Sequence, residues 1–114
     1  MKMTIHPMAG DLTVISLEGR LDIQGADAID DQFAFATTTK PKRIVVDLSQ
    51  VVFMASIGIR TLFTAARAQT ARGGRIVLAA PTEMVNKVLL TAGVDQLMPI
   101  FDSVELACTA LESA

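Results

Sequence analysis

The chain has 114 residues, of which 51% are apolar and 19% are charged, and its formal net charge is −2. A chain of this length removes roughly two thirds of its unfolded surface from water, so we expect one domain over residues 1–114, and disorder is excluded. The weak acidity, together with the absence of Trp and Tyr, argues against a nucleic-acid-binding surface.

Membrane insertion and secretion are also disfavoured. No apolar run approaches the ~20 residues of a membrane-spanning helix. His6 and Pro7 interrupt the amino terminus before the hydrophobic core of a signal peptide develops. Cys108 is the single cysteine and cannot form an internal disulfide, which fits a reducing compartment. We therefore expect a cytoplasmic protein without a membrane span.

The first part of the chain predicts a β-hairpin followed by a helix. Met3 and Ile5 lie on one face of a first strand, residues 12–18 form a second, and turn residues such as Gly10 lie between them. Over residues 25–38 the apolar residues recur at helical spacing. Three aspartates favour the positive start of that helix: Asp27, Asp30 and Asp31.

A central strand and a second helix come next. Residues 40–42 (KPK) break the first helix, and residues 44–48 are almost continuously β-branched, as in a parallel strand buried on both faces. An amphipathic helix follows and ends at Arg72 and Gly73. Its apolar stripe contains Ile59, Leu62, Phe63 and Ala66.

Strands and helices then continue to alternate. We expect a strand over residues 76–80, a helix that begins at Pro81 and Thr82 and stops at Gly93, and an edge strand over residues 98–101. Asp102 and Glu105 resemble a capping box that opens a last helix, which carries Cys108 as a small core residue. A hairpin followed by this alternation predicts an α/β or α+β domain.

Catalytic and cofactor-binding patterns are absent. The glycines match neither phosphate-binding motif, so no nucleotide cofactor is expected. His6 and Cys108 lie near opposite ends of the sequence, which argues against a metal site. A catalytic triad could use only His6, and no nucleophile elbow is present. We therefore expect a protein that is not an enzyme.

Ser56 is the most informative residue because it falls where a loop meets the second helix. A serine there can cap the helix through its side-chain oxygen. It can also accept a phosphate, because the start of a helix favours negative charge. Gly58 either improves access to the Ser56 hydroxyl or permits close packing of the helix on the sheet. Arg60 lies on the polar face of the helix, near Ser56.

Several sequence blocks occur in a characteristic order: residues 17–22 (LEGRLD), 46–49 (VDLS), 53–59 (FMASIGI), 73–78 (GGRIVL), 88–94 (VLLTAGV) and 101–107 (FDSVELA). Together they resemble the STAS domain family, and specifically the stand-alone anti-sigma factor antagonists of bacteria. The resemblance covers essentially the whole chain. It implies a mixed, mainly parallel sheet of about five strands, flanked by about four helices.

The resemblance also implies a function. In this family the unmodified protein binds an anti-sigma factor and so releases a sigma factor for transcription. The anti-sigma factor is often a serine kinase that phosphorylates the residue matching Ser56, and a metal-dependent protein serine phosphatase reverses the modification. The implied partner-binding residues are Asp22, Ala55, Ile57, Gly58, Ile59 and Arg60. Asp22 has a second interpretation, as a cap of the turn before the first helix.

The chain departs from the family pattern beside Ser56. Ala55 replaces the usual acid, Ile57 replaces a small hydroxyl residue, and Arg60 replaces a residue that is often small. The missing carboxylate removes a repulsion with phosphate, and Arg60 could pair with the phosphate. If the kinase reads that acid, however, Ser56 stays unmodified and the protein binds its partner constitutively.

Two other functions are compatible with the sequence. The domain could be a scaffold subunit of a signalling or transport assembly in which Ser56 is never phosphorylated, an interpretation that Ala55 favours. A small hydrolase or nucleotide-binding protein has little support beyond the presence of serine and histidine. The oligomeric state is not predicted.

Overall fold

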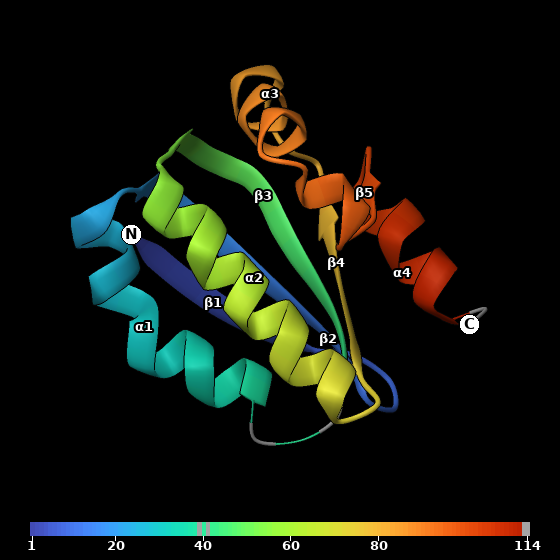
Figure 1. The fold of residues 1–114 in the computed structure, drawn as a ribbon. Coiled ribbons are helices and arrows are strands. Elements are labelled where there is room, and N and C mark those ends of the chain that lie inside the picture. Colours follow the sequence, from blue (N-terminus) through green and yellow to red (C-terminus); the bar gives the residue numbers. More distant parts are fainter. Residues whose placement is uncertain (39, 41, 113–114) are drawn as a thin grey trace.

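The protein is built on one five-stranded sheet. In the computed structural model, which describes residues 1–38, 40 and 42–112, the strand order is β1-β2-β3-β4-β5. The strands are β1 Lys2–Pro7, β2 Leu12–Leu21, β3 Arg43–Met54, β4 Arg75–Ala79 and β5 Ile100–Phe101 (Figure 1). β1 pairs with β2 in antiparallel orientation, and the other neighbours are parallel. The predicted hairpin and mainly parallel sheet are confirmed.

β3 is the central strand and is longer than expected. Ile44, Val45 and Val46 are fully buried between β2 and β4, as the β-branched run predicts. The strand continues six residues beyond Leu48 to Met54, although Ser49 is exposed. β2 follows it through two register shifts, so that Leu21 pairs with Met54. Both strands therefore end at the same edge of the sheet.

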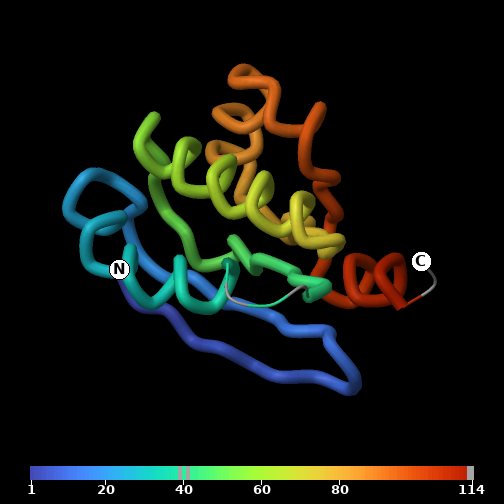
Figure 2. The backbone as a smooth tube through the Cα atoms, turned by 60° about the horizontal axis from the view of Figure 1, so that its bottom comes forward, coloured from blue at the N-terminus to red at the C-terminus, as the bar shows by residue number. Residues whose placement is uncertain are grey.

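Helices cover the two faces of the sheet unequally. The helices are α1 Ile23–Thr38, α2 Ser56–Ala71, α3 Glu83–Thr91 and α4 Val104–Glu112, with a 3₁₀ turn at Val94–Gln96. Apolar residues of α1, α2 and α3 share one core with alternate residues of β2, β3 and β4. α4 packs against the other face, over Val45 and Val77. In Figure 2, α4, in red, lies apart from α2 and α3. The count of four helices agrees with the prediction for the described residues.

The ends of α3 and α4 test the capping predictions. Thr82 accepts a hydrogen bond from the Val85 N–H at 3.3 Å, and Gly93 ends α3 with φ +74°, both as expected. The prediction for α4 was wrong by one residue, because the Ser103 hydroxyl accepts the Leu106 N–H at 3.1 Å. The capping side chain is therefore Ser103 and not Asp102.

Other element boundaries also differ from the sequence prediction. β2 extends to Leu21 where residue 18 was expected, and β4 covers Arg75–Ala79 where residues 76–80 were expected. α1 begins at Ile23 and not at residue 25, so that Asp22 is the carboxylate at its start and Asp27 lies beyond the first turn. β5 has two residues where four were expected, because Met98 is fully buried in the core and Pro99 has no N–H to donate to a neighbouring strand. α1 ends before Lys40, as predicted; Pro41 lies outside the described residues.

No helix within the described ranges is long and apolar enough to cross a bilayer.

Candidate functional site

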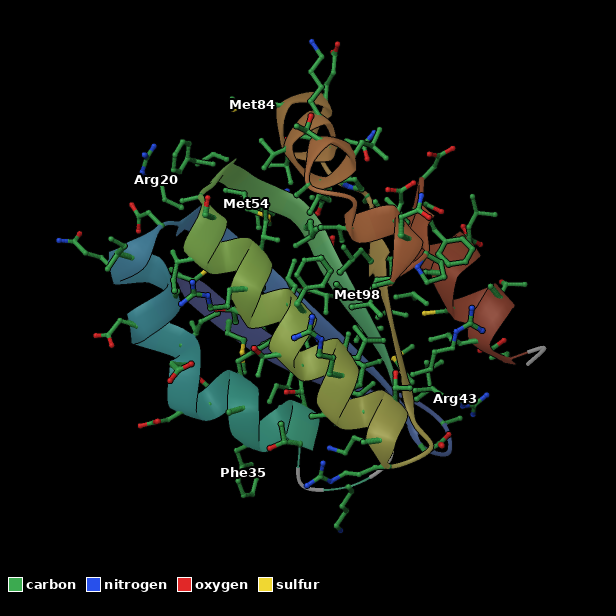
Figure 3. All side chains as sticks on the ribbon, in the orientation of Figure 1. Arg20, Phe35, Arg43, Met54, Met84 and Met98 are labelled. Carbon is green, nitrogen blue, oxygen red and sulfur yellow. The ribbon has the colours of Figure 1, made fainter. Side chains whose placement is uncertain are left out.

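Two strand-to-helix junctions meet at one edge of the sheet. The pair Leu21 and Met54 ends β2 and β3, and the Ala55 N–H then donates to the Leu21 carbonyl oxygen at 3.0 Å. Figure 3 labels Arg20 and Met54 at this end of the molecule and Arg43 at the opposite end. The predicted site residues Asp22 and Ser56, far apart in the sequence, therefore belong to adjacent junctions.

Gly58 allows the start of α2 to pack closely against β2. It is buried, and a Cβ built on it would lie 2.7 Å from Leu21 Cγ and 3.0 Å from the Leu21 carbonyl oxygen. Real Cβ atoms essentially never approach another atom as closely as 2.7 Å. The close-packing interpretation of Gly58 therefore accounts for the glycine, which shapes the site through the backbone.

Ser56 is the first residue of α2 and is exposed. Of the two interpretations of Ser56 that the sequence left open, the one in which its side chain caps the helix was wrong. The N-cap is Ala55, whose backbone is extended with φ −99° and ψ 171°, and no side chain caps the helix. The cause is the length of β3, which carries the extended conformation through Ala55. The Ser56 hydroxyl makes no hydrogen bond with any residue that the structure describes.

The residues after Ser56 point to two different sides of α2. Ile57 and Arg60 line a cavity of about 170 Å³ between α1 and α2, together with Asp30. Ile57 and Asp30 also line an adjoining cavity of about 340 Å³. Ile59 and Ser56 line a third cavity, shallow and widely open to solvent, of about 350 Å³, between α2 and α3. Arg60 and Ser56 therefore line different cavities, although they lie one turn apart.

Asp22 caps α1 and pairs with Arg20. Its Oδ1 accepts the Gly25 N–H at 2.8 Å, and its Oδ2 lies 3.4 Å from Arg20 Nε. The Gly25 N–H, followed by the Arg20 guanidinium, holds the pKa of the Asp22 carboxyl below its ordinary value against an opposing effect of desolvation. The Arg20 guanidinium in turn stacks on the Phe53 ring, 4.2 Å from its centroid. The capping interpretation of Asp22 is confirmed.

Comparison with known proteins identifies the family of this chain. Residues 3–107 match the model of the STAS domain. The chain belongs to the STAS domain family. BtrV of Bordetella bronchiseptica, described as a candidate anti-sigma factor antagonist, is 25% identical over 114 residues, which are 100% of this chain and 97% of BtrV.

Solved structures show the same STAS fold. An anti-sigma factor antagonist from Mycobacterium paratuberculosis superposes with a TM-score of 0.88 at 22% identity, over 97% of this chain and 93% of that protein. SpoIIAA of Bacillus, solved in its phosphorylated form, gives a TM-score of 0.71 at 23% identity, over 96% of this chain and 99% of SpoIIAA. The predicted fold class and family are therefore confirmed.

His6 and Cys108 have ordinary structural positions in this STAS domain. His6 lies on the edge strand β1 and is exposed. Cys108 is half-buried on α4 against the smaller core, where desolvation, followed by the charge of Glu112, raises the pKa of its thiol. Among the described residues, no three His, Cys, Asp or Glu side chains lie close enough together to hold a metal ion.

Sequence reasoning missed the contribution of α3 to the site. Lys87, Val88 and Thr91 line the same cavity as Ser56, about thirty residues further along the chain. Only the packing of α3 beside α2 brings them there, and no local pattern in the sequence signals it. Lys87 is therefore a second cation to consider beside Arg60, which the sequence had placed near Ser56.

Proposed function

We propose that this STAS domain is an anti-sigma factor antagonist that acts in the cytoplasm as a binding protein, without catalysis. In its unmodified form it sequesters an anti-sigma factor that is also a serine kinase. Phosphorylation of Ser56 releases it, and a protein serine phosphatase restores it. The observation that carries this proposal is the exposed Ser56 hydroxyl, which has no hydrogen-bond partner among the described residues. The phosphorylated form of SpoIIAA supports it.

The proposed docking surface surrounds that hydroxyl. It comprises Asp22, Ala55, Ile57, Gly58, Ile59 and Arg60, which the paired strand ends bring to one edge. Ile57 and Ile59 are only half-buried, so each has apolar surface left to bury against a partner. Gly58 is buried, so it belongs to the proposed surface only through the close approach of α2 to β2 that its missing side chain permits.

Phosphorylation would weaken such a contact for a physical reason. In the proposed step the kinase transfers the γ-phosphoryl group of ATP to Ser56 Oγ, the hydroxyl proton leaves, and ADP is released. Hydrolysis by the phosphatase returns the hydroxyl and inorganic phosphate. The phosphate adds about −1.5 to −2 charges. Burying that charge beside Ile57 and Ile59 costs several kcal/mol unless the partner supplies cations.

The test is a phosphorylation assay on the intact protein. The purified domain is incubated with its cognate anti-sigma factor kinase and ATP, and its mass is measured. We expect the mass of one phosphoryl group to be added to the wild type and to Ser49→Ala, which removes another exposed serine, but not to Ser56→Ala. An unmodified wild type, or a modified Ser56→Ala, would refute phosphorylation at Ser56.

A scaffold subunit of a signalling or transport assembly is the second candidate function, and Ala55 favours it. An acid at that position would cap α2 and place a negative charge beside Ser56, and alanine supplies neither the cap nor the charge. In a scaffold, Ser56→Asp leaves the association with the assembly unchanged. In the antagonist that we propose, the same change weakens binding to the anti-sigma factor.

A further inference from the structure

The cavity beside Ser56 is lined by hydrogen-bond donors from α3. Ser56 and Ile59 form its α2 side, and Lys87, Val88, Thr91 and Ala92 form its α3 side. Lys87 and Thr91 are four residues apart, so they lie on one face of α3. An ammonium group offers three donors and a hydroxyl offers one. Among the residues that the structure describes, no carboxylate lines this cavity, whereas Asp30 lines both cavities between α1 and α2.

The Lys87 ammonium is available for a new ion pair. Within the described residues, the ion pairs are Arg20 with Asp22 and Arg43 with Asp11. Glu83 lies one turn before Lys87 on α3 but is not within ion-pair distance. Lys87 is exposed, and the neighbouring Val88 is half-buried. The cavity therefore presents a free cation next to a partly apolar surface.

We propose that the phosphate on Ser56 is held in this cavity by the Lys87 ammonium and the Thr91 hydroxyl, so that α3 is part of the switch. This inference rests on the proposed function, because it concerns the modified state of Ser56. A phosphate monoester offers acceptor oxygens and negative charge, and the cavity offers donors and a positive charge. The phosphate and the cavity lining are therefore chemically complementary.

Arg60 is the competing cation, and its position argues against it. It lines the cavity between α1 and α2, where Asp30 is also present. Arg20, at the end of β2, already pairs with Asp22 and stacks on Phe53. Asp22, in the junction adjacent to that of Ser56, carries a negative charge that would repel a phosphate on Ser56. Among these groups, Lys87 alone lines the cavity of Ser56.

A phosphate held in this cavity would also promote release of the partner in a second way, in addition to charge repulsion. A phosphate bridging Ser56 and α3 would lie over Ile59 and Val88, whose half-buried side chains line the same cavity. Apolar surface offered to a partner by the unmodified protein would then be covered by the protein's own phosphate and its counterion. Lys87 therefore acts as a positioning residue for the phosphate.

The test uses the full chain with phosphoserine incorporated at position 56 by an expanded genetic code, which requires no kinase. The second pKa of the phosphate is measured by ³¹P NMR titration in the wild type, in Lys87→Gln and in Arg60→Gln as the matched control. A cation at contact distance lowers this pKa by about half a unit or more. We expect Lys87→Gln to raise the second pKa of the phosphate by that amount. Lys87→Arg should keep this pKa at the wild-type value, and Arg60→Gln should change it little.

The outcomes separate this inference from the proposed function. An unchanged pKa in Lys87→Gln, or a larger rise in Arg60→Gln, would overturn the role of Lys87 and leave phosphorylation of Ser56 by the kinase unaffected. Conversely, a kinase that ignores Ser56 would overturn the proposed function whatever the titration shows. Two-dimensional amide NMR of each variant checks that the fold is retained.

Discussion

The backbone N–H of Ala55 donates a hydrogen bond to the carbonyl oxygen of Leu21 at 3.0 Å. This bond extends the pairing of β2 and β3 by one residue beyond Met54 and connects the two strand-to-helix junctions. It uses only backbone atoms of Ala55, so the side chain at this position is free to change without breaking it. The Ala55 position is therefore open to substitution, and the start of α2 lacks a side-chain cap.

The first prediction is that Ala55→Asp stabilises the protein. A carboxylate at the N-cap accepts a hydrogen bond from a first-turn N–H and interacts favourably with the helix dipole. We expect the free energy of unfolding, measured by urea denaturation, to rise by about 1 kcal/mol. Ala34→Asp adds the same charge on an exposed position inside α1 and should give no such gain. Equal effects of the two changes would disprove the capping explanation.

The second prediction is that Gly58→Ala destabilises the protein although alanine favours helices. The added methyl would overlap Leu21 Cγ at 2.7 Å. Alanine gains about 1 kcal/mol in helix propensity over glycine, and overpacking a core costs about 1 to 3 kcal/mol. We expect a net loss of about 1 kcal/mol in urea unfolding. Thr64→Ala, on the exposed face of α2, should instead be neutral or slightly stabilising, and a stabilised Gly58→Ala would contradict the packing.

The third prediction concerns Gln69, a fully buried polar residue of α2. Its amide nitrogen donates to the Thr37 and Lys40 carbonyl oxygens, the latter at 2.8 Å, and its Oε1 accepts the Lys42 N–H at 2.9 Å. Gln69→Leu leaves these backbone groups without their partner, and we expect a loss of about 3 kcal/mol in the free energy of unfolding.

Gln32→Leu provides the control for Gln69, because Gln32 is exposed on α1. It should change the free energy of unfolding by less than about 0.5 kcal/mol. If the two leucine variants unfold at the same urea concentration, the hydrogen bonds of Gln69 do not connect α2 to the segment after α1 in the way described.

The fourth prediction is a pH dependence that comes from Asp22. Because folding lowers the pKa of its carboxyl from 3.8, Asp22 stabilises the fold above about pH 4, and this contribution is lost as the pH falls below that value toward the folded-state pKa. Asn also caps helices well but does not titrate. The stability difference between the wild type and Asp22→Asn should therefore shrink on acidification.

The matched variant for Asp22 is Arg20→Gln. It removes the smaller contribution to the lowered pKa and leaves the Gly25 hydrogen bond in place, so most of the acid dependence should remain. Thermal unfolding between about pH 7 and pH 3 measures both effects. A constant difference between the wild type and Asp22→Asn over that range would show that Asp22 does not titrate with folding.

The fifth prediction separates binding from stability at Ser56. Ser56→Asp should be at least as stable as the wild type, because the hydroxyl has no hydrogen bond to lose among the described residues and the start of α2 favours a negative charge. Its affinity for the cognate anti-sigma factor, measured by calorimetry, should fall at least ~10-fold. Ser49→Asp places the same charge on an exposed position of β3 and should bind normally. Loss of cooperative unfolding in Ser56→Asp would indicate a structural role for Ser56.

Local patterns in the sequence determined most of the elements of this protein. The β-branched run of β3, the capping Thr82 and the terminating Gly93 act through their own backbone or near neighbours. Their structural meaning can be read without knowing the rest of the fold. The ordered motif blocks likewise indicated the STAS family, which the match over residues 3–107 confirms.

Tertiary structure alone decided how the site is assembled. The length of β3 moved the N-cap from Ser56 to Ala55, and the pairing of Leu21 with Met54 placed Asp22 at the same edge. The packing of α3 beside α2 brought Lys87 to the cavity of Ser56. These relationships depend on strand register and helix packing between segments far apart in sequence. Such contacts leave no period or spacing in the chain, because they are set by the shape of the whole core.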